Sequence, residues 1–173
     1  MIRIVIAAFI LIFAIGIFSY SRMRSYTNLL RPTGDIKAWH WDQGGGASGG
    51  ISVEQDALKA EILKTDGEAG NLSLYQETAV LKEGHKYRFT FTGKSTVTRT
   101  ITAFATNGYF PGSDGGEVGM KTDFTLDSQW KQQEATFYAK GTNGAICRVP
   151  ILYFGAGPPA TIWLKDVRLE EAG

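Results

Sequence analysis

Two hydrophobic patterns divide the chain. Residues 4–20 contain no charged side chain and show no polar face at any helical phase. From residue 28 onward, apolar and polar residues alternate in short stretches, and turn signals recur about every 8–12 residues, the spacing of strands in a sandwich or barrel. The pattern therefore predicts one hydrophobic N-terminal helix followed by one all-β domain.

The N-terminal segment has the length of a membrane-spanning helix. Counted from Ile2 to Tyr20 it has 19 residues, which would give a helix of roughly 28 Å, and the hydrocarbon layer is about 30 Å thick. A cleaved signal peptide is the alternative, because Arg3 supplies a basic start, but the apolar stretch is long and no A-x-A motif ends it. We therefore predict a transmembrane anchor over residues 1–21 and a polar linker over residues 22–27.

The remaining residues, 28–173, predict an antiparallel two-sheet β-sandwich. A glycine-rich stretch at residues 44–50 is expected to form a flexible loop. The expected strands are Ile51–Glu54, Lys59–Leu63, Leu72–Glu77, Lys86–Thr92, Arg99–Thr106, Met120–Leu126, Lys131–Tyr138, Ile146–Phe154 and Thr161–Leu169.

Alternation within these strands predicts which residues face the core. The three aromatic residues of 86–92 share one face, which we assign to the core. In residues 99–106, Phe104 falls on the face occupied by threonines, as in an open groove. In residues 72–77, Tyr75 falls on the polar, outward face.

Composition narrows the class of protein. The 173 residues include 18 Lys and Arg against 17 Asp and Glu, for a formal net charge of +1, which argues against nucleic acid as a partner. The 21 glycines and 12% aromatic residues are typical of a loop-rich β-protein. Cys147 is the only cysteine, so no intrachain disulfide can form and core packing must stabilise the domain.

Four motifs in order resemble a known family. They are NLLRPTGD at residues 28–35, LKEGHKYRF at 81–89, DSQWK at 127–131 and WLKDVRL at 163–169. Together they resemble the jelly-roll carbohydrate-binding modules of the galactose-binding-like fold, the type associated with xylanases and glucanases. The resemblance covers residues 28–171 and implies a non-catalytic domain that binds carbohydrate.

The resemblance also bears on metal binding. Many family members hold a structural calcium ion with a glutamate of the opening motif and an aspartate of the closing strand. Lys37 replaces that glutamate here, and Lys165 stands where an aspartate is usual, although Asp35 and Asp166 remain. Because calcium needs several oxygen ligands and excludes an ammonium group, we expect no metal and no cofactor.

Sugar-binding sandwiches stack aromatic rings on the apolar faces of pyranose rings, with polar side chains binding the hydroxyl groups. The candidate residues outside the evident core are Trp39, Trp41, Tyr75, Gln76, Phe104, Tyr109 and Phe110.

Each candidate has a structural alternative. Trp39 and Trp41 could pack under the first strand, and Tyr109 and Phe110 could cover an edge of the sandwich. Two further tryptophans, Trp130 and Trp163, lie within strand motifs that usually point inward, so we expect them in the core.

No motif for catalysis accompanies these residues. His40 and His85 are the only histidines, and neither has a nucleophile motif nearby. The glycine-rich stretch lacks the Lys-Ser/Thr of a phosphate-binding loop. We therefore expect a protein that is not an enzyme.

Two functions remain open. The first is a membrane-anchored, non-catalytic sandwich that binds glycan at the extracytoplasmic face. The alternative is an accessory subunit of a larger integral-membrane complex, for example photosynthetic or respiratory, with the sandwich capping its periplasmic face. In that case Ala8, Ala14 and Gly16 would let another transmembrane helix approach closely.

The charges beside the apolar segment and the type of domain predict opposite orientations. Arg22, Arg24 and Arg31 follow it and Arg3 precedes it, so the positive-inside rule alone would place the β-domain in the cytoplasm. Since domains of the resembled type are mostly extracytoplasmic, we expect a single-pass protein of the inner membrane with a periplasmic β-domain.

Overall fold

The computed structural model describes residues 27–108 and 116–173. The anchor predicted at residues 1–21, with its packing residues Ala8, Ala14 and Gly16, therefore lies outside the described residues. Among the residues that are described, no helix has the length and apolar character needed to span a membrane.

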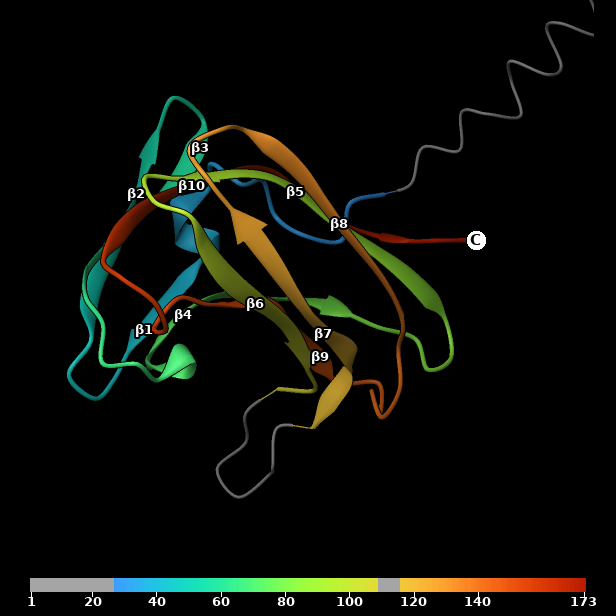
Figure 1. Ribbon diagram of the computed structural model, residues 1–173. Coiled ribbons are helices and arrows are strands. Elements are labelled where there is room, and N and C mark those ends of the chain that lie inside the picture. The colour runs from blue at the N-terminus through green and yellow to red at the C-terminus, as the bar shows by residue number, and fades with distance from the viewer. Residues whose placement is uncertain (1–26, 109–115) are drawn as a thin grey trace, which may run out of the picture.

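Within these described residues, ten strands form two five-stranded antiparallel sheets, which face each other in Figure 1. Sheet A has the strand order β1-β4-β9-β6-β7, and sheet B has the order β2-β3-β10-β5-β8. Two short 3₁₀ helices, η1 and η2, lie between strands. The elements are η1 Ile36–Ala38, β1 His40–Gln43, β2 Ser48–Glu54, β3 Ala57–Lys64, η2 Ala69–Asn71, β4 Leu72–Val80, β5 Lys86–Ser95, β6 Arg99–Thr106, β7 Glu117–Leu126, β8 Lys131–Tyr138, β9 Ile146–Tyr153 and β10 Ala160–Glu171.

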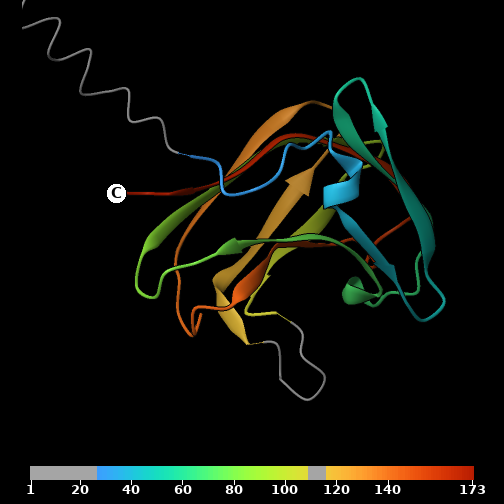
Figure 2. The same cartoon turned by 180° about the vertical axis from the view of Figure 1, so that it is seen from behind.

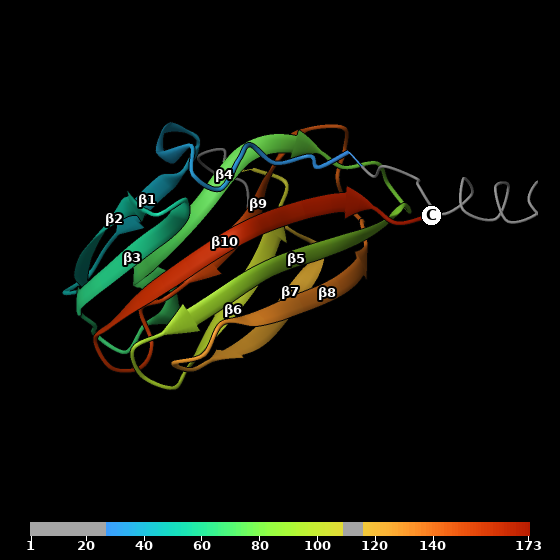
Figure 3. The ribbon, with the colours of Figure 1, turned by 90° about the horizontal axis from the view of Figure 1, so that it is seen from above.

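The predicted two-sheet sandwich is confirmed, and each of the nine expected strands overlaps an observed one. Figure 3 looks onto sheet B, with β10 between β3 and β5. Two details differ. The short strand β1 was not predicted, and β2 begins inside the stretch expected to be a flexible loop. Gly49 explains the second difference, because a Cβ there would lie 2.4 Å from the carbonyl oxygen of Glu61 on the neighbouring strand. Only glycine allows β2 and β3 to lie this close together at residue 49.

Aromatic side chains fill the space between the sheets. The rings of Phe91 and Phe124 meet edge to face, with centroids 5.1 Å apart, and Phe89 lies beside both. Tyr87 stacks on Phe137 at 5.7 Å. The predicted inward face of residues 86–92 is thus confirmed, and contacts between the two sheets hold the sandwich together.

The segment before η1 runs beside β10 and fastens the open side of the sandwich (Figure 2). The backbone N–H of Leu29 donates to the carbonyl of Leu169. The backbone N–H of Leu169 in turn donates to the side-chain oxygen of Asn28. Gln76, which is fully buried, accepts from the N–H of Arg31 and donates to its carbonyl oxygen. The opening motif is therefore a structural clasp between the two sheets.

Candidate functional site: the outer face of sheet A

The antiparallel register of sheet A arranges its outward side chains in rows that cross all five strands. One row runs from His40 through Tyr75, Ile151 and Phe104 to Lys121. Outward side chains from strands far apart in the sequence therefore share one surface, as the alternation of strand residues requires.

The next row lies beside the first. It runs from Asp42 through Ser73, Tyr153 and Thr102 to Asp123. The centre of this surface is thus aromatic, and both ends carry polar groups.

Phe104 and Tyr153 form the aromatic centre. Their ring centroids lie 4.7 Å apart at an interplanar angle of 45°, on neighbouring strands β6 and β9. Both side chains are half-buried, so part of each ring faces solvent. The sequence prediction that Phe104 lies among threonines on an open face is confirmed, since Ile101 and Ala103 point the other way into the core.

Tyr75 supports this surface from below. It is 6% exposed, and its ring stacks on exposed His40 with centroids 5.1 Å apart and planes 13° from parallel. The Arg148 guanidinium lies 4.6 Å from the same ring. Burial and a hydrogen bond to Asp42 raise the pKa of the Tyr75 hydroxyl. Tyr75 thus contacts three polar neighbours on this face, namely His40, Arg148 and Asp42. We name Phe104, Tyr153, Tyr75 and His40 the aromatic platform.

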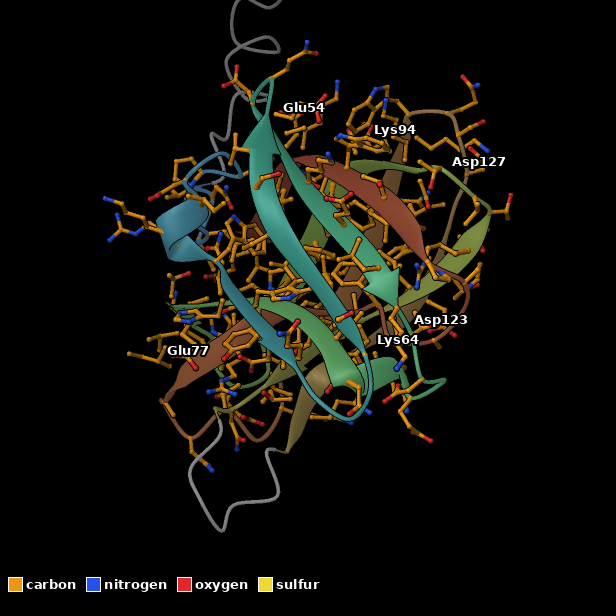
Figure 4. The ribbon with its side chains drawn as sticks, turned by 90° about the vertical axis from the view of Figure 1, so that its left-hand side faces the viewer. Glu54, Lys64, Glu77, Lys94, Asp123 and Asp127 are labelled. Carbon is orange, nitrogen blue, oxygen red and sulfur yellow. The ribbon has the colours of Figure 1, made fainter. Side chains whose placement is uncertain are left out.

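Polar groups flank the platform on both sides, and each is held by a neighbour. The Arg148 Nε donates to a carboxylate oxygen of Glu77. On the other side, the Thr102 hydroxyl donates to the Asp123 carboxylate, 2.6 Å away. In Figure 4, Glu77 lies at the left and Asp123 at the right. These groups offer a preorganised set of donors and acceptors beside the rings.

Three of the predicted sugar-contact residues lie inward. Trp39 is 5% exposed, and its indole N–H donates to the carbonyl of Thr33. Trp41 is half-buried and stacks on core residue Phe154. Gln76 is occupied by the backbone of the opening motif, as described above. These three side chains are supporting residues, so the open surface consists of other residues.

The two remaining candidates, Tyr109 and Phe110, lie between β6 and β7, outside the described residues. Of the predicted set, the structure brings Tyr75 and Phe104 together on one face. It adds Tyr153, His40 and Arg148, which the sequence pattern did not indicate.

The reason is visible in the sequence of β9. The run VPILYF at residues 149–154 is apolar throughout, and the register of β9 against β4 and β6 shifts within it. Alternation therefore cannot assign Tyr153 to a face. His40 stands between two candidate tryptophans in the sequence, but no strand was expected there that would place its side chain on a face.

The prediction that Trp130 and Trp163 are core residues is wrong. Trp130 is 38% exposed, and Trp163 is half-buried on the outer face of sheet B. Ile162 and Leu164 take the inward positions of β10, so the residue between them must point outward. Lys165 also lies on this face, with its ammonium 4.6 Å from the Trp130 ring.

A hollow of about 440 Å³ lies between the opening motif at residues 28–35 and β10, where the resemblance would have placed a calcium ion. Asp56 and Asp166 line it, but the side-chain oxygens of Asn28 and Thr33 beside them already accept backbone N–H groups. Calcium takes 6–8 oxygen ligands, so these residues do not fit it. Among the described residues, no group of three or more His, Cys, Asp or Glu could hold a metal ion.

Comparison with known proteins gives the fold a name. No family model and no curated protein matches the chain. Among solved structures, a CBM4 module is similar with a TM-score of 0.67 and 17% identity, over 84% of this chain and 97% of its own. The N-terminal cellulose-binding domain of Cellulomonas fimi β-1,4-glucanase C gives 0.65 and 21%, over 85% and 98%. Its second cellulose-binding domain gives 0.63 and 14%, over 87% and 98%.

The sandwich has the jelly-roll fold of carbohydrate-binding modules. The match extends over nearly the whole of each of these modules, in agreement with the resemblance noted in the four sequence motifs. At these identities the likeness is one of fold, and the chemistry of the face has to be argued from the residues on it.

Proposed function

We propose that the protein binds a neutral glycan on the outer face of sheet A. The observation that carries the proposal is the pair of half-exposed rings of Phe104 and Tyr153, 4.7 Å apart in the middle of a five-stranded face. Such rings offer flat apolar surface to the C–H faces of a sugar, and flanking polar groups bind its hydroxyls. The likeness to carbohydrate-binding modules supports the same function.

The charges on the face support a neutral ligand. Four carboxylates face outward from sheet A, against two permanent cations; these residues are Asp42, Glu77, Asp123 and Glu117, and Arg148 and Lys121. A uronic acid polymer would meet a net negative surface and be repelled. The hydroxyls of a neutral sugar can instead bond to either charge type.

We propose binding without hydrolysis. A glycosidase flanks the scissile bond with two carboxyl groups, one of which must act as an acid. On this face three of the four carboxylates are held by neighbours: Glu77 pairs with Arg148, Asp123 accepts from Thr102, and Asp42 accepts from the Tyr75 hydroxyl. Carboxylates held in this way support recognition. Incubation with the bound oligosaccharide, followed by an assay for new reducing ends, tests this part of the proposal, and release of reducing ends would overturn it.

The binding test uses the full chain in detergent. A glycan array of neutral β-glycans identifies a ligand, and calorimetry then measures the affinity. Phe104→Ala and Tyr153→Ala should each weaken binding by roughly tenfold, since a stacked aromatic contributes about 1 kcal/mol beyond its buried area. Tyr138→Ala is the matched control, because Tyr138 is 64% exposed on sheet B. Absence of any neutral ligand, or equal losses in all three variants, would overturn the proposal.

We further propose that residues 1–21 anchor the sandwich at the extracytoplasmic face of the inner membrane. The support is the uncharged run of residues 4–20 and the absence of a cleavage motif after it. The full chain should resist carbonate extraction, and protease added to spheroplasts should digest the sandwich. Extraction by carbonate would refute the anchor, and protection from protease would refute the orientation. Co-migration with a large complex in mild detergent would favour the accessory-subunit alternative.

A further inference from the structure

The opposite side of the sandwich carries a second aromatic surface. On the outer face of sheet B, Trp163 of β10 lies between Lys59 of β3 and Lys94 of β5 in register. Trp130 immediately precedes β8, whose first residue pairs with the neighbour of Lys94. Lysine and tryptophan therefore alternate across the sheet. We name Lys59, Trp163, Lys94 and Trp130, together with adjacent Lys165, the Lys–Trp row.

The two rings hold two of the ammonium groups in place. The Lys94 Nζ lies 4.9 Å from the centroid of Trp130 and 4.7 Å from that of Trp163, while the Lys165 Nζ lies 4.6 Å from Trp130. These are cation–π distances. Long lysine side chains fixed in this way lose less conformational freedom when they bind a ligand.

In the described part of the chain, these two ammonium groups have no partner of opposite charge. Within residues 27–108 and 116–173, no carboxylate lies within 4 Å of Lys94 or Lys165, although both side chains are half-buried. Lysine is rarely removed from water without a paired anion. Each ammonium has three N–H donors, so both retain the capacity to bind an anion.

Within the row, lysines outnumber carboxylates. Glu54 is the carboxylate that meets it, accepting from the Trp163 indole N–H at 3.4 Å and lying 3.8 Å from the Lys59 ammonium. Figure 4 shows Glu54 and Lys94 on the upper side of the sandwich, opposite Glu77 and Asp123. The two outer faces thus differ in charge: the face around the platform has excess carboxylates, and the Lys–Trp row has excess ammonium groups.

The surroundings of the row suit hydroxyl groups. Lys165 pairs in register with Thr92, which in turn pairs with Gln132, and Ser52 lies beyond Lys59. Hydroxyl and amide side chains favour a hydroxylated ligand over the acyl chains of a membrane. Three lysines in a chain of net charge +1 are also few for a nucleic acid, whose affinity depends on many phosphate contacts.

We propose that the Lys–Trp row is a second binding site, specific for an acidic polysaccharide whose sugar units carry carboxylates. The Lys94 and Lys165 ammonium groups pair with the carboxylates, and the exposed part of the Trp130 ring packs against the sugar. This site is independent of the platform, because it lies on the other sheet. The protein can therefore hold a neutral and an acidic glycan on its two faces.

The test compares polygalacturonate with its methyl-esterified form, which has the same backbone without the charge. The full chain in detergent should bind polygalacturonate with at least tenfold higher affinity than the ester. Its affinity for polygalacturonate should fall as the salt concentration is raised. The double variant Lys94→Gln/Lys165→Gln should weaken polygalacturonate binding by about tenfold. The control Lys64→Gln/Lys140→Gln removes the same charge from exposed residues elsewhere and should bind like the parent protein.

Aromatic variants on the two faces show which site binds polygalacturonate. Trp130→Ala should weaken polygalacturonate binding, whereas Phe104→Ala/Tyr153→Ala should leave it unchanged, which distinguishes this site from the platform. Equal binding of acid and ester, or equal losses in both lysine double variants, would overturn the proposal. Binding of anionic vesicles or oligonucleotides through the same lysines, without polygalacturonate binding, would overturn the assigned ligand class.

Discussion

Tyr75 and His40 stack nearly face to face, with ring centroids 5.1 Å apart, and the tyrosine lies beneath the histidine. The tyrosine is almost completely covered and the histidine is exposed. The relationship assigns different tasks to two neighbouring rings: one supports the surface, and the other is available to a ligand.

This relationship predicts different effects for two substitutions of Tyr75. Tyr75→Phe keeps the stack and removes the bond to Asp42, so we expect glycan affinity to change by less than about threefold. Tyr75→Ala should lower the free energy of unfolding by about 3–5 kcal/mol, as for other large buried aromatics. Calorimetry and urea unfolding measure the two effects. A tenfold affinity loss in Tyr75→Phe would show instead that the hydroxyl contacts the ligand.

Gln76 should affect stability and leave binding unchanged. Gln76→Ala leaves the N–H and carbonyl groups of Arg31 without their side-chain partner. An unsatisfied buried polar group costs about 1–3 kcal/mol, and we expect that decrease in the free energy of unfolding. Gln132→Ala, on the exposed surface of β8, is the control and should change stability by less than about 0.5 kcal/mol. Equal losses in the two variants would contradict the clasp.

The fold was largely readable from the sequence because strand alternation is a local signal. KYRFTFT and RTITAFAT each have one apolar and one polar face, and the observed strands follow them. The same signal placed Phe104 on the open face. It failed where both faces of a strand are apolar, as around Tyr153, and where a tryptophan stands between two core residues, as at Trp163.

The site was less predictable than the fold because it depends on register between distant strands. Phe104 and Tyr153 are separated by 49 positions in the printed numbering, and β6 and β9 bring them together. Nothing local to either residue specifies that pairing. The calcium argument likewise depended on Lys165, which follows inward-facing Leu164 and therefore lies on the outer face of sheet B.

Gly119 should be among the least replaceable glycines in the described part of the chain. It has a φ of +104°, and a Cβ there would lie 2.1 Å from the carbonyl oxygen of Tyr138. Gly119→Ala should therefore combine backbone strain with a steric clash and lower the free energy of unfolding by roughly 3 kcal/mol or more. Gly141→Ala is the matched control, because Gly141 also has a positive φ, +63°, but a Cβ there would meet open space. This substitution should lower the free energy of unfolding by about 1 kcal/mol. Equal losses would show that the contact with β8 is unimportant.

Glu170 should make the domain sensitive to acid. Its side chain is buried and bonds to Arg88 at 2.8 Å and to Arg168. Burial alone would raise the pKa of Glu170, but the hydrogen bonds and charges of the two arginines lower it overall. A carboxyl whose folded-state pKa is lowered stabilises the protein above its ordinary pKa of about 4.3, and that stability is lost as the pH falls through the lowered folded value.

The measurement is urea unfolding at a series of pH values. Glu170→Gln should lower the free energy of unfolding at pH 7 by about 1–3 kcal/mol and should reduce the loss of stability below about pH 4.5. Glu61→Gln, on the exposed surface of β3, should leave the pH profile as in the parent protein. A Glu170→Gln profile parallel to that of the parent would contradict the assignment.

The position of β10 has a consequence for how the domain is made in the cell. Sheet B is assembled around this strand, which follows all the others in the chain and pairs with both β3 and β5. Until residues 160–171 have left the ribosome, β2–β3 and β5–β8 have no strand to join them, and their inner edges stay open to other chains. Synthesis of the sandwich therefore passes through a stage in which the two halves of sheet B, β2–β3 and β5–β8, are not yet joined, and a chaperone that shields open strand edges would act at that stage.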